Sequence, residues 1–175
     1  QKILGFNRDC YWPVHHSSVV AFPRRILVGV DVCPGYSNSC NINGENGIAI
    51  GDYTQIASGV GIQSSNHNLY DLRNQESSSP IKIGSYCWLG QNAIILPGVV
   101  LGDFTVVGAG AVVTKSFPDG HAVLAGIPAK PIKYLDVNKC LRFKNETEYV
   151  GYISKLKLEE NLSKYVDLEC VGLAD

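Results

Sequence analysis

Histidine is the side chain best suited to remove a proton near neutral pH, and this chain has four of them. An unperturbed pKa of about 6.5 lets the imidazole take a proton from a hydroxyl group and then release it. His15 and His16 lie in an irregular aromatic segment, and His121 follows an Asp-Gly turn. His67 lies where a regular repeat gives way to a long polar segment, which makes it the candidate general base.

Positive side chains cluster near residue 140, although the chain as a whole is almost neutral. Lys and Arg number 15 against 16 Asp and Glu, and no long basic stripe is interleaved with aromatic residues, so a nucleic-acid partner is not expected. The stretch 130–144 is the exception, because only Asp136 opposes its cations, and such a cluster suits the phosphates of a ligand. Its cations are Lys130, Lys133, Lys139, Arg142 and Lys144.

The elements that must position these groups follow a repeat of six residues. Side chains alternate along an extended strand, so a period of six requires one short strand and one sharp corner per unit. Glycine often follows the aliphatic residue, at Gly84, Gly90, Gly102 and Gly108, and supplies the corner geometry at little steric cost. Three units, about 18 residues, close one triangular coil, and stacked coils bury an aliphatic column. This column consists of Ile50, Ile56, Ile62, Ile83, Leu89, Ile95, Leu101, Val107 and Val113.

One interruption of the repeat predicts a loop beside His67. The spacing from Ile62 to Ile83 is not a multiple of six, so the frame slips between them. The residues at about 66–80 are polar and cannot supply a buried aliphatic column. We therefore expect them to leave the coil as a protruding loop, and loops on a rigid scaffold commonly carry binding or catalytic groups.

The repeat divides the chain into three parts. Residues 1–24 are aromatic and broken by proline, which is typical of a cap over the first coil, and residues 25–134 form the coiled domain. Residues 135–175 form a charged C-terminal extension. Apolar residues at helical spacing between 152 and 166 predict a short helix within it.

The coiled domain resembles the hexapeptide-repeat acyltransferases, and most closely their sugar and polysaccharide O-acetyltransferases. The resemblance rests on IGSYCWLGQNAIILPGVVLGDFTVVGAGAVVTKSFP, on AGIPAKPIK and, upstream, on SSNHNLYDLR. It covers roughly residues 24 to 135 and implies a mainly β fold, the left-handed parallel β-helix. It also implies transfer of an acetyl group from acetyl-CoA to a saccharide hydroxyl by direct attack, with no acyl-enzyme and no required metal.

The resemblance assigns roles to individual residues. His67 matches the histidine of the family's S-x-N-H motif, which makes it the general base. In the repeat Trp88 precedes Leu89 at an expected coil corner, where a large ring points outward. It stands where related acetyltransferases carry tryptophan, so its indole is expected either to stack on a sugar or the pantetheine arm or to pack between subunits. Contacts with the pantetheine arm are implied at Gly90, Gln91, Ala109 and Gly110. Contacts with the phosphate or adenine end are implied at Thr114, Lys115, Pro128, Lys130 and Lys133.

Recognition of the acceptor falls to the less regular segments, which are residues 36–43, the loop 66–79 and the N-terminal cap. Asn38 or Asn41 is the candidate for binding a sugar hydroxyl, as an asparagine does in galactoside and maltose acetyltransferases. An insertion around NGENG leaves open which of the two corresponds. Asp71 and Arg73 are candidates to orient the loop or the acceptor.

Assembly and location follow from the shape and composition. The narrow interior of such a column is filled by side chains, so a CoA groove must lie between two surfaces. The resemblance implies a homotrimer with sites between subunits, in which His67 faces lysines of the adjacent subunit. The six cysteines form no C-x-x-C pair, which is typical of reduced thiols in a cytoplasmic protein. No apolar stretch approaches the roughly 20 residues of a membrane span.

Other functions of the same fold stay open. N-acetylation of an amino sugar, or acetylation of an antibiotic hydroxyl by a xenobiotic acetyltransferase, is not separated from O-acetylation by these residues. A zinc carbonic anhydrase needs three converging histidines, whereas His67 has no histidine partner at suitable spacing in the regular coils. A non-catalytic β-helix module keeps the repeats without needing His67, Trp88, Lys115 and Lys130 together. We therefore predict an acetyl-CoA-dependent O-acetyltransferase acting on a saccharide.

Overall fold

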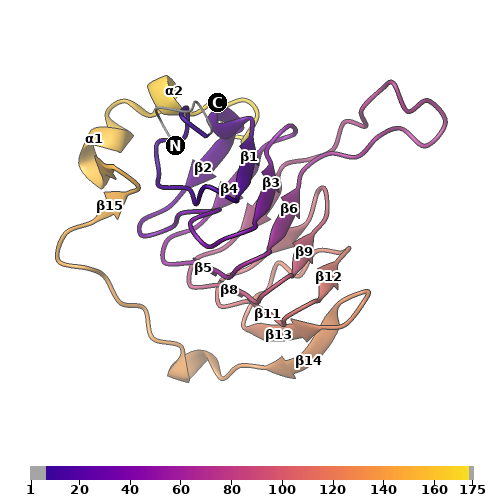
Figure 1. Cartoon of the computed structure of the whole chain (residues 1–175). Helices are drawn as coiled ribbons and strands as arrows, with labels where there is room; N and C mark the ends of the chain where they lie inside the picture. The colour runs from indigo at the N-terminus through magenta and orange to yellow at the C-terminus, as the bar shows by residue number, and fades with distance from the viewer. Residues whose placement is uncertain (1–6, 174–175) are drawn as a thin grey trace.

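The chain winds into a three-sided column (Figure 1). The computed structural model describes residues 7–173 of the 175. Each side of the column is a sheet, and from β1 to β13 each strand pairs in parallel with strands of the same side in the adjacent coils. This is the parallel β-helix that the six-residue repeat predicts.

The three sides, here called the first, second and third face, carry these strands. The first face contains β1 (Val19–Ala21), β3 (Asn41–Asn43), β6 (Gly61–Gln63), β9 (Ile94–Ile95) and β12 (Val112–Val113). The second contains β2 (Ile26–Val28), β4 (Ile48–Ile50), β7 (Ile81–Ile83) and β10 (Val100–Leu101). The third contains β5 (Gln55–Ile56), β8 (Trp88–Leu89), β11 (Val106–Val107), β13 (Ala122–Ala125) and β14 (Lys130–Tyr134). Because β14 pairs with β13 in the antiparallel sense, it ends the column.

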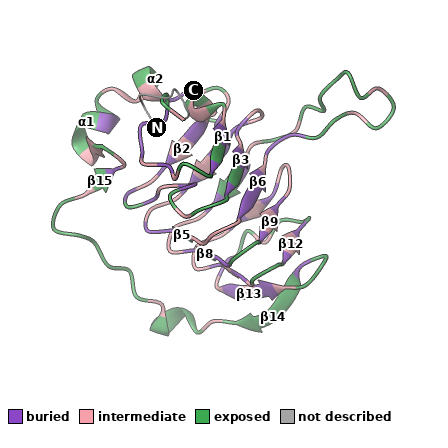
Figure 2. Cartoon of the chain, in the orientation of Figure 1, coloured by how far each residue is buried: buried purple, intermediate pink, exposed green. Residues whose placement is uncertain are grey.

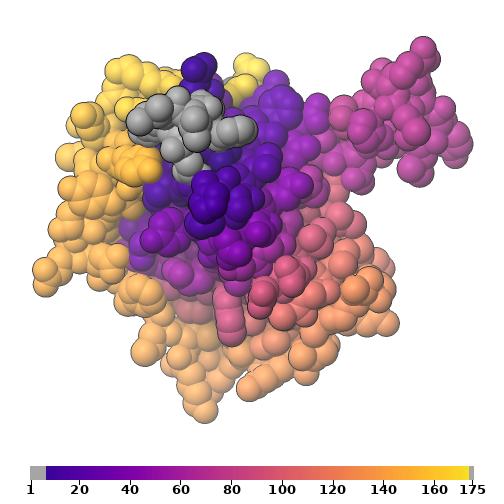
Figure 3. Space-filling model, in the orientation of Figure 1, coloured from indigo at the N-terminus to yellow at the C-terminus, as the bar shows by residue number. Residues whose placement is uncertain are grey.

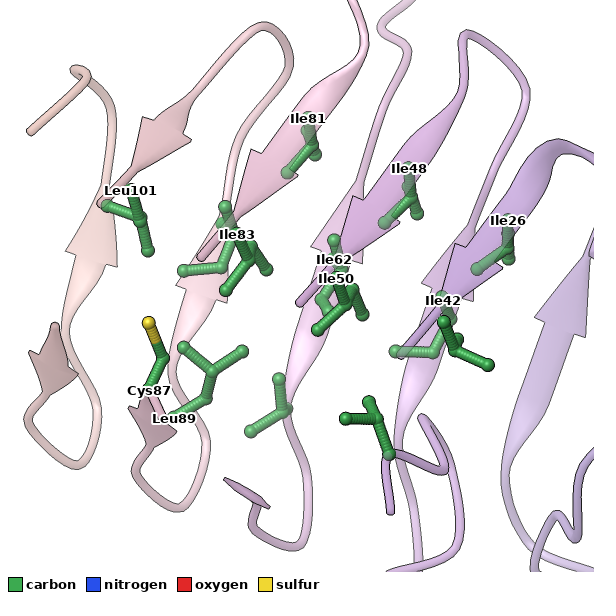
Figure 4. Close-up of a cluster of buried hydrophobic side chains, with 14 of the residues drawn as sticks. Ile26, Ile42, Ile48, Ile50, Ile62, Ile81, Ile83, Cys87, Leu89 and Leu101 are labelled. Carbon is green, nitrogen blue, oxygen red and sulfur yellow. The ribbon is translucent and has the colours of Figure 1, made fainter. Parts of the chain in front are cut away.

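The interior of the column is the aliphatic stack expected from the sequence (Figures 2 and 4). Leu89, Ile95, Val107 and Val113 have no exposed surface. The small or branched residues four positions after each aliphatic are buried as well, Cys87 among them. Burial raises the pKa of the Cys87 thiol to about 11, so the group stays neutral and serves packing. The stack is less regular at one of its expected members, Ile56, which is only partly buried.

The glycines of the repeat have a different role from the one the sequence suggested. None of Gly84, Gly90, Gly102 and Gly108 has a positive φ. A Cβ on Gly84 would lie 2.6 Å from the backbone N of Asp103, and a Cβ on Gly90 would lie 2.7 Å from the carbonyl O of Val107. Gly84 and Gly90 therefore require glycine because adjacent coils approach each other closely there.

The left-handed backbone at the corner between the second and third faces is carried by large residues. Tyr53, Tyr86, Phe104 and His121 all have φ between 47° and 58°. Their rings form a ladder along the column, with centroids 5.3 Å apart from Tyr53 to Tyr86, 5.0 Å from Tyr86 to Phe104 and 5.2 Å from Phe104 to His121. Stacking between coils offsets the strain that each positive φ introduces.

The first coil begins earlier than the aliphatic pattern indicated. Parallel pairing starts at Val19, where β1 pairs with β3, and a short 3-10 turn, Pro23–Arg25, leads into β2. The expected cap, residues 1–24, thus contributes a strand to the column, and its residues 1–6 lie outside the described part. Trp12, which belongs to this segment, is buried in the core.

The C-terminal extension returns along the column to its starting end (Figure 1). Beyond a 3-10 turn, Val137–Lys139, Arg142 pairs with Asp103 at 2.6 Å, and the backbone N–H of Asn145 donates to the hydroxyl of Tyr53 (3.0 Å). The chain then forms β15, β16, α1 and α2, so the single expected helix is two short ones. Their bounds are Tyr149–Val150, Ile153–Ser154, Lys155–Glu159 and Leu162–Tyr165.

Candidate active site

The loop that carries His67 leaves the column at the corner between the first and second faces, between β6 and β7, and projects away from it (Figures 1 and 3). Asn46, in the adjacent coil, anchors the base of the loop. Its side-chain amide donates to the carbonyl O of Ser64 (3.0 Å), to that of Glu76 (2.9 Å) and to the hydroxyl of Ser78 (3.3 Å). The two ends of the excursion are thereby held to one side chain.

His67 lies at the start of the projecting part, where the loop forms a narrow antiparallel bridge with Gln75. Its Nδ1 lies 2.9 Å from the carbonyl O of Leu72. A carbonyl oxygen only accepts hydrogen bonds, so Nδ1 carries the proton and donates. In the neutral ring the other nitrogen, Nε2, then holds a free lone pair, and the side chain is exposed.

The loop tip is held by its own side chains. Arg73 donates from Nε to Oδ1 of Asp71 (2.8 Å) and from an η nitrogen to Oδ2 (3.0 Å). These hydrogen bonds keep the pKa of Asp71 below its usual value. The Asn74 side chain also donates to Asp71. Asp71 and Arg73 thus pair with each other in this loop, and their carboxylate and guanidinium groups fix its turn.

Trp88 is exposed and points outward, as expected, although it does not lie at a corner. It is the first residue of β8 on the third face and pairs in register with Gln55 of β5 and Val106 of β11. Its side chain is 56% exposed. In-register neighbours point to the same side of a sheet about 4.8 Å apart, so Gln55 and Trp88 form one continuous outer surface.

The residues expected along the pantetheine arm share one corner, between the third and first faces, which is here called the arm corner. Gly90 is buried there and Gln91 is exposed. Ala109 and Gly110 occupy the same corner one coil further on, where the N–H of Gly110 donates to the carbonyl O of Gln91 (2.8 Å). Pro128 follows at the corner of the next coil. These residues make a line parallel to the column axis.

The residues expected at the phosphate end are divided between two places. Lys130 and Lys133 lie on β14, at the end of that line, and both are exposed. Thr114 and Lys115 are also exposed but follow β12, so they lie at the same corner as the His67 loop. The expected cations therefore do not form one cluster within a single chain.

The two candidate asparagines lie apart from His67 along the chain, and neither lies at the corner that carries the His67 loop. Asn38 is exposed at the corner before β3, where its side-chain oxygen accepts a hydrogen bond from the hydroxyl of Ser58. Asn41 begins β3, is exposed, and its carbonyl O accepts from the Gln63 amide (2.9 Å). Both residues are exposed. Asn38 lies at the corner between the third and first faces, and Asn41 lies on the first face.

Two groups of predicted residues thus occupy opposite edges of the first face. His67 lies at the edge that joins the second face, whereas Gln91, Ala109 and Gly110 lie at the edge that joins the third. Sequence reasoning missed Asn46, because its place beneath the loop depends on stacking between coils. Its only sequence signal is the turn-rich NGENG segment.

Within residues 7–173, no group of three or more His, Cys, Asp or Glu side chains is arranged to hold a metal ion. No helix in the described part of the chain has the length and apolar character needed to cross a membrane.

The fold and sequence of the chain are similar to those of known proteins. Residues 80–115 match the family model of the bacterial transferase hexapeptide, described as six repeats. A crystal structure of a maltose O-acetyltransferase from Clostridium difficile 630 is 34% identical, with a TM-score of 0.60 over 70% of this chain and 66% of that chain. The chain belongs to the hexapeptide-repeat acyltransferase family. Its column is accordingly the left-handed parallel β-helix of that family.

Two further relatives of this hexapeptide-repeat protein are described as O-acetyltransferases from Escherichia coli K12. A putative lipopolysaccharide biosynthesis O-acetyl transferase, WbbJ, is 41% identical over 49% of this chain and 50% of the relative. A galactoside O-acetyltransferase is 38% identical over 56% of this chain and 50% of the relative. A galactoside acetyltransferase structure in complex with coenzyme A has a TM-score of 0.62 at 27% identity, covering 81% and 70% of the two chains. The chain spans about half the length of the curated relatives it matches.

Proposed function

We propose that this chain is an acetyl-CoA-dependent O-acetyltransferase that acetylates a hydroxyl of a saccharide, with His67 as the general base. The observation that carries the proposal is the hydrogen bond from Nδ1 of His67 to the carbonyl O of Leu72 at 2.9 Å. It fixes the ring orientation and leaves Nε2 as the basic atom. The matched maltose and galactoside O-acetyltransferases support the saccharide as acceptor.

The chemistry asked of the protein is small, because the thioester of acetyl-CoA is already activated. Nε2 of His67 removes the proton of the acceptor hydroxyl as its oxygen attacks the thioester carbonyl carbon. The C–S bond then breaks, and the imidazolium returns the proton to the departing sulfur. The Leu72 carbonyl, which accepts from Nδ1 throughout, stabilises the transient positive charge on the ring.

The other predicted residues bind and orient the co-substrate. Gly110 has a positive φ of 69° and open space where a Cβ would be, so the backbone of this corner is accessible to the pantetheine arm. The exposed ammonium groups of Lys130 and Lys133 lie at the end of the same line and suit the phosphates. Trp88 presents its indole beside this path on the third face.

Assembly as a homotrimer is part of the proposal. A single chain keeps His67 and the arm corner on opposite edges of the first face, so one acetyl group cannot contact both within that chain. A second copy that brings its arm corner to the His67 loop completes the site. Lys115 lies at the same corner as the His67 loop. In the trimer it therefore faces the cleft that holds the phosphate end of the CoA bound to the partner subunit.

The test of the base is a pair of histidine variants. His67→Asn should lower kcat by about 10² to 10⁴, because a general base contributes that much, with acetyl-CoA binding retained. His121→Asn is the matched control, since His121 lies at a different corner and asparagine tolerates its φ of 47°. Release of free CoA is measured with neutral sugars, amino sugars and antibiotic alcohols as acceptors. Full activity in His67→Asn, or turnover of amino sugars alone, contradicts the proposal.

The shared site is tested by mixing two inactive chains. His67→Ala removes the base, and Ala109→Trp blocks the exposed arm corner in the other chain. In randomly mixed trimers each site needs one chain of each type in the right order, so roughly a quarter of wild-type activity should return. Activity that stays absent in mixtures of verified mixed assembly, or a fully active monomer on analytical ultracentrifugation, contradicts the intersubunit site.

A further inference from the structure

A hollow of about 400 Å³ lies on the third face, at the end of the column where the chain begins. Its wall is built from three separate segments: the N-terminal cap, the turn before β3, and strand β5. The residues that matter for its chemistry are Pro13, Asp31, Tyr36, Ser37 and Gln55. None of them belongs to the residues assigned above to the base or to CoA.

Tyr36 stands at the centre of this region as an exposed ring on a fixed backbone. Its side chain is 65% exposed, and together with Pro13 it also lines a second hollow on its other side. The turn that carries it is held by the N–H of His15, which donates to the carbonyl O of Gly35 (2.7 Å), and by the indole of Trp12, which donates to that of Pro34 (2.8 Å). An aromatic platform held in this way binds a ligand without first having to be ordered.

Two polar side chains of the hollow are available to a ligand. The carboxylate of Asp31 and the side-chain amide of Gln55 make no hydrogen bond to any other described residue. By contrast, the hydroxyl of Ser37 is already used, because it donates to the carbonyl O of Ile56 (2.8 Å). A carboxylate and an amide beside an aromatic face match the hydroxyl groups and the apolar face of a pyranose.

The hollow is continuous with the proposed acyl-transfer surface. Gln55, which lines it, pairs in register with Trp88 on the next strand of the third face. The predicted CoA residues run from Lys133 at the far end of the column toward Gln91, so the acyl end of the arm points toward the level of Trp88. The Tyr36 hollow lies one strand beyond Trp88 in the same direction.

We infer that the Tyr36 hollow is a saccharide subsite that binds a sugar unit adjacent to the one being acetylated. The acceptor is therefore an oligosaccharide or a longer glycan, with one unit on Tyr36 and the next beside Trp88. This inference rests on the proposed function for its location relative to the acetyl group. The binding of a sugar at Tyr36 stands on the hollow itself.

Direct binding tests the subsite without relying on turnover. Saturation-transfer NMR of the CoA-free protein is recorded with methyl glycosides of glucose, galactose and N-acetylglucosamine, and with the corresponding disaccharides. Wild type is expected to bind at least one disaccharide, and Tyr36→Ala to weaken that binding about tenfold. Tyr36→Phe keeps the ring and should keep the binding, and Tyr134→Ala, an exposed tyrosine on β14, is the matched control. The subsite is overturned if no saturation transfer reaches any of these sugars, or if Tyr36→Ala binds them as wild type does.

Kinetics then separate this inference from the proposed function. For the disaccharide that binds, wild type should show at least tenfold higher kcat/KM than for the monosaccharide. Tyr36→Ala and Gln55→Ala should reduce that ratio toward one while leaving the KM for acetyl-CoA unchanged. Disaccharide binding without any acetyl transfer contradicts the proposed function but not the subsite. Acetyl transfer in which Tyr36→Ala leaves the disaccharide-to-monosaccharide ratio of kcat/KM unchanged contradicts the subsite alone.

Discussion

The column and the His67 loop solve the same problem, holding a short piece of chain in place, by different means. In the column each residue is fixed by burial between coils, as Leu89 shows with no exposed surface. In the loop the side chains are largely exposed, and hydrogen bonds such as those of Asn46 and Asp71 fix the backbone. The scaffold therefore tolerates changes at its outer surface, whereas the loop depends on a few polar contacts.

Truncating one leucine in each region should separate the two regions most clearly. Leu89→Ala leaves a cavity in the column and should lower the free energy of unfolding by about 2–5 kcal/mol. Leu69→Ala, at a loop residue that is 81% exposed, should change it by less than about 0.5 kcal/mol. Urea unfolding followed by circular dichroism measures both. Equal effects of the two variants would erase the distinction between the regions.

An intermediate effect is expected where the loop joins the column. Asn46→Ala removes three side-chain hydrogen bonds that hold the loop base, so it should lower the free energy of unfolding by about 1–3 kcal/mol. It should also lower kcat more than it raises the KM for acetyl-CoA, because His67 loses its fixed position. Asn138→Ala, in an exposed turn, is the control. Wild-type kinetics in Asn46→Ala would mean that the loop holds His67 without its anchor.

A weaker effect is a pH response confined to the loop. Arg73 depresses the pKa of Asp71, so this pair stabilises the loop tip fully above the ordinary value of 3.8 and loses that stabilisation as the pH falls through the lowered pKa. NMR titration of the Asp71 carboxyl, with amide exchange of the tip, follows this change. In Arg73→Gln the pKa should return toward 3.8. A wild-type carboxyl that titrates at or above that value contradicts the pairing.

The sequence predicted the column better than it predicted how the column is closed. The aliphatic period located the faces and the slip before Ile83, because burial repeats along the chain. It assigned the wrong reason to Gly84, since the approach of Asp103 depends on a coil that is distant in sequence. The ladder of Tyr53, Tyr86 and Phe104 was likewise hidden, because single aromatics at a corner gain their meaning only after stacking.

The candidate site shows the same division. A motif was enough to single out His67, yet the bond that determines its tautomer goes to a backbone carbonyl, and any residue at position 72 supplies one. Trp88 was expected at a corner and lies on a flat face, which joins it to Gln55. Tyr36 was part of a segment suspected of acceptor binding, but its hollow is assembled from three segments whose proximity depends on the coil.

The returning C-terminal segment has a consequence for synthesis on the ribosome. Leu158, Val166 and Val171 are buried against the end of the column that is translated first, and the N–H of Asp167 donates to the carbonyl O of Arg24 (2.6 Å). Nascent chains gain structure from the N-terminus onward, but here the opening coil stays without its cover until residues 158–171 have been made. This end of the column is therefore completed long after its own strands are synthesised, and a chain stalled before residue 158 leaves that coil open to chaperones and to other nascent chains.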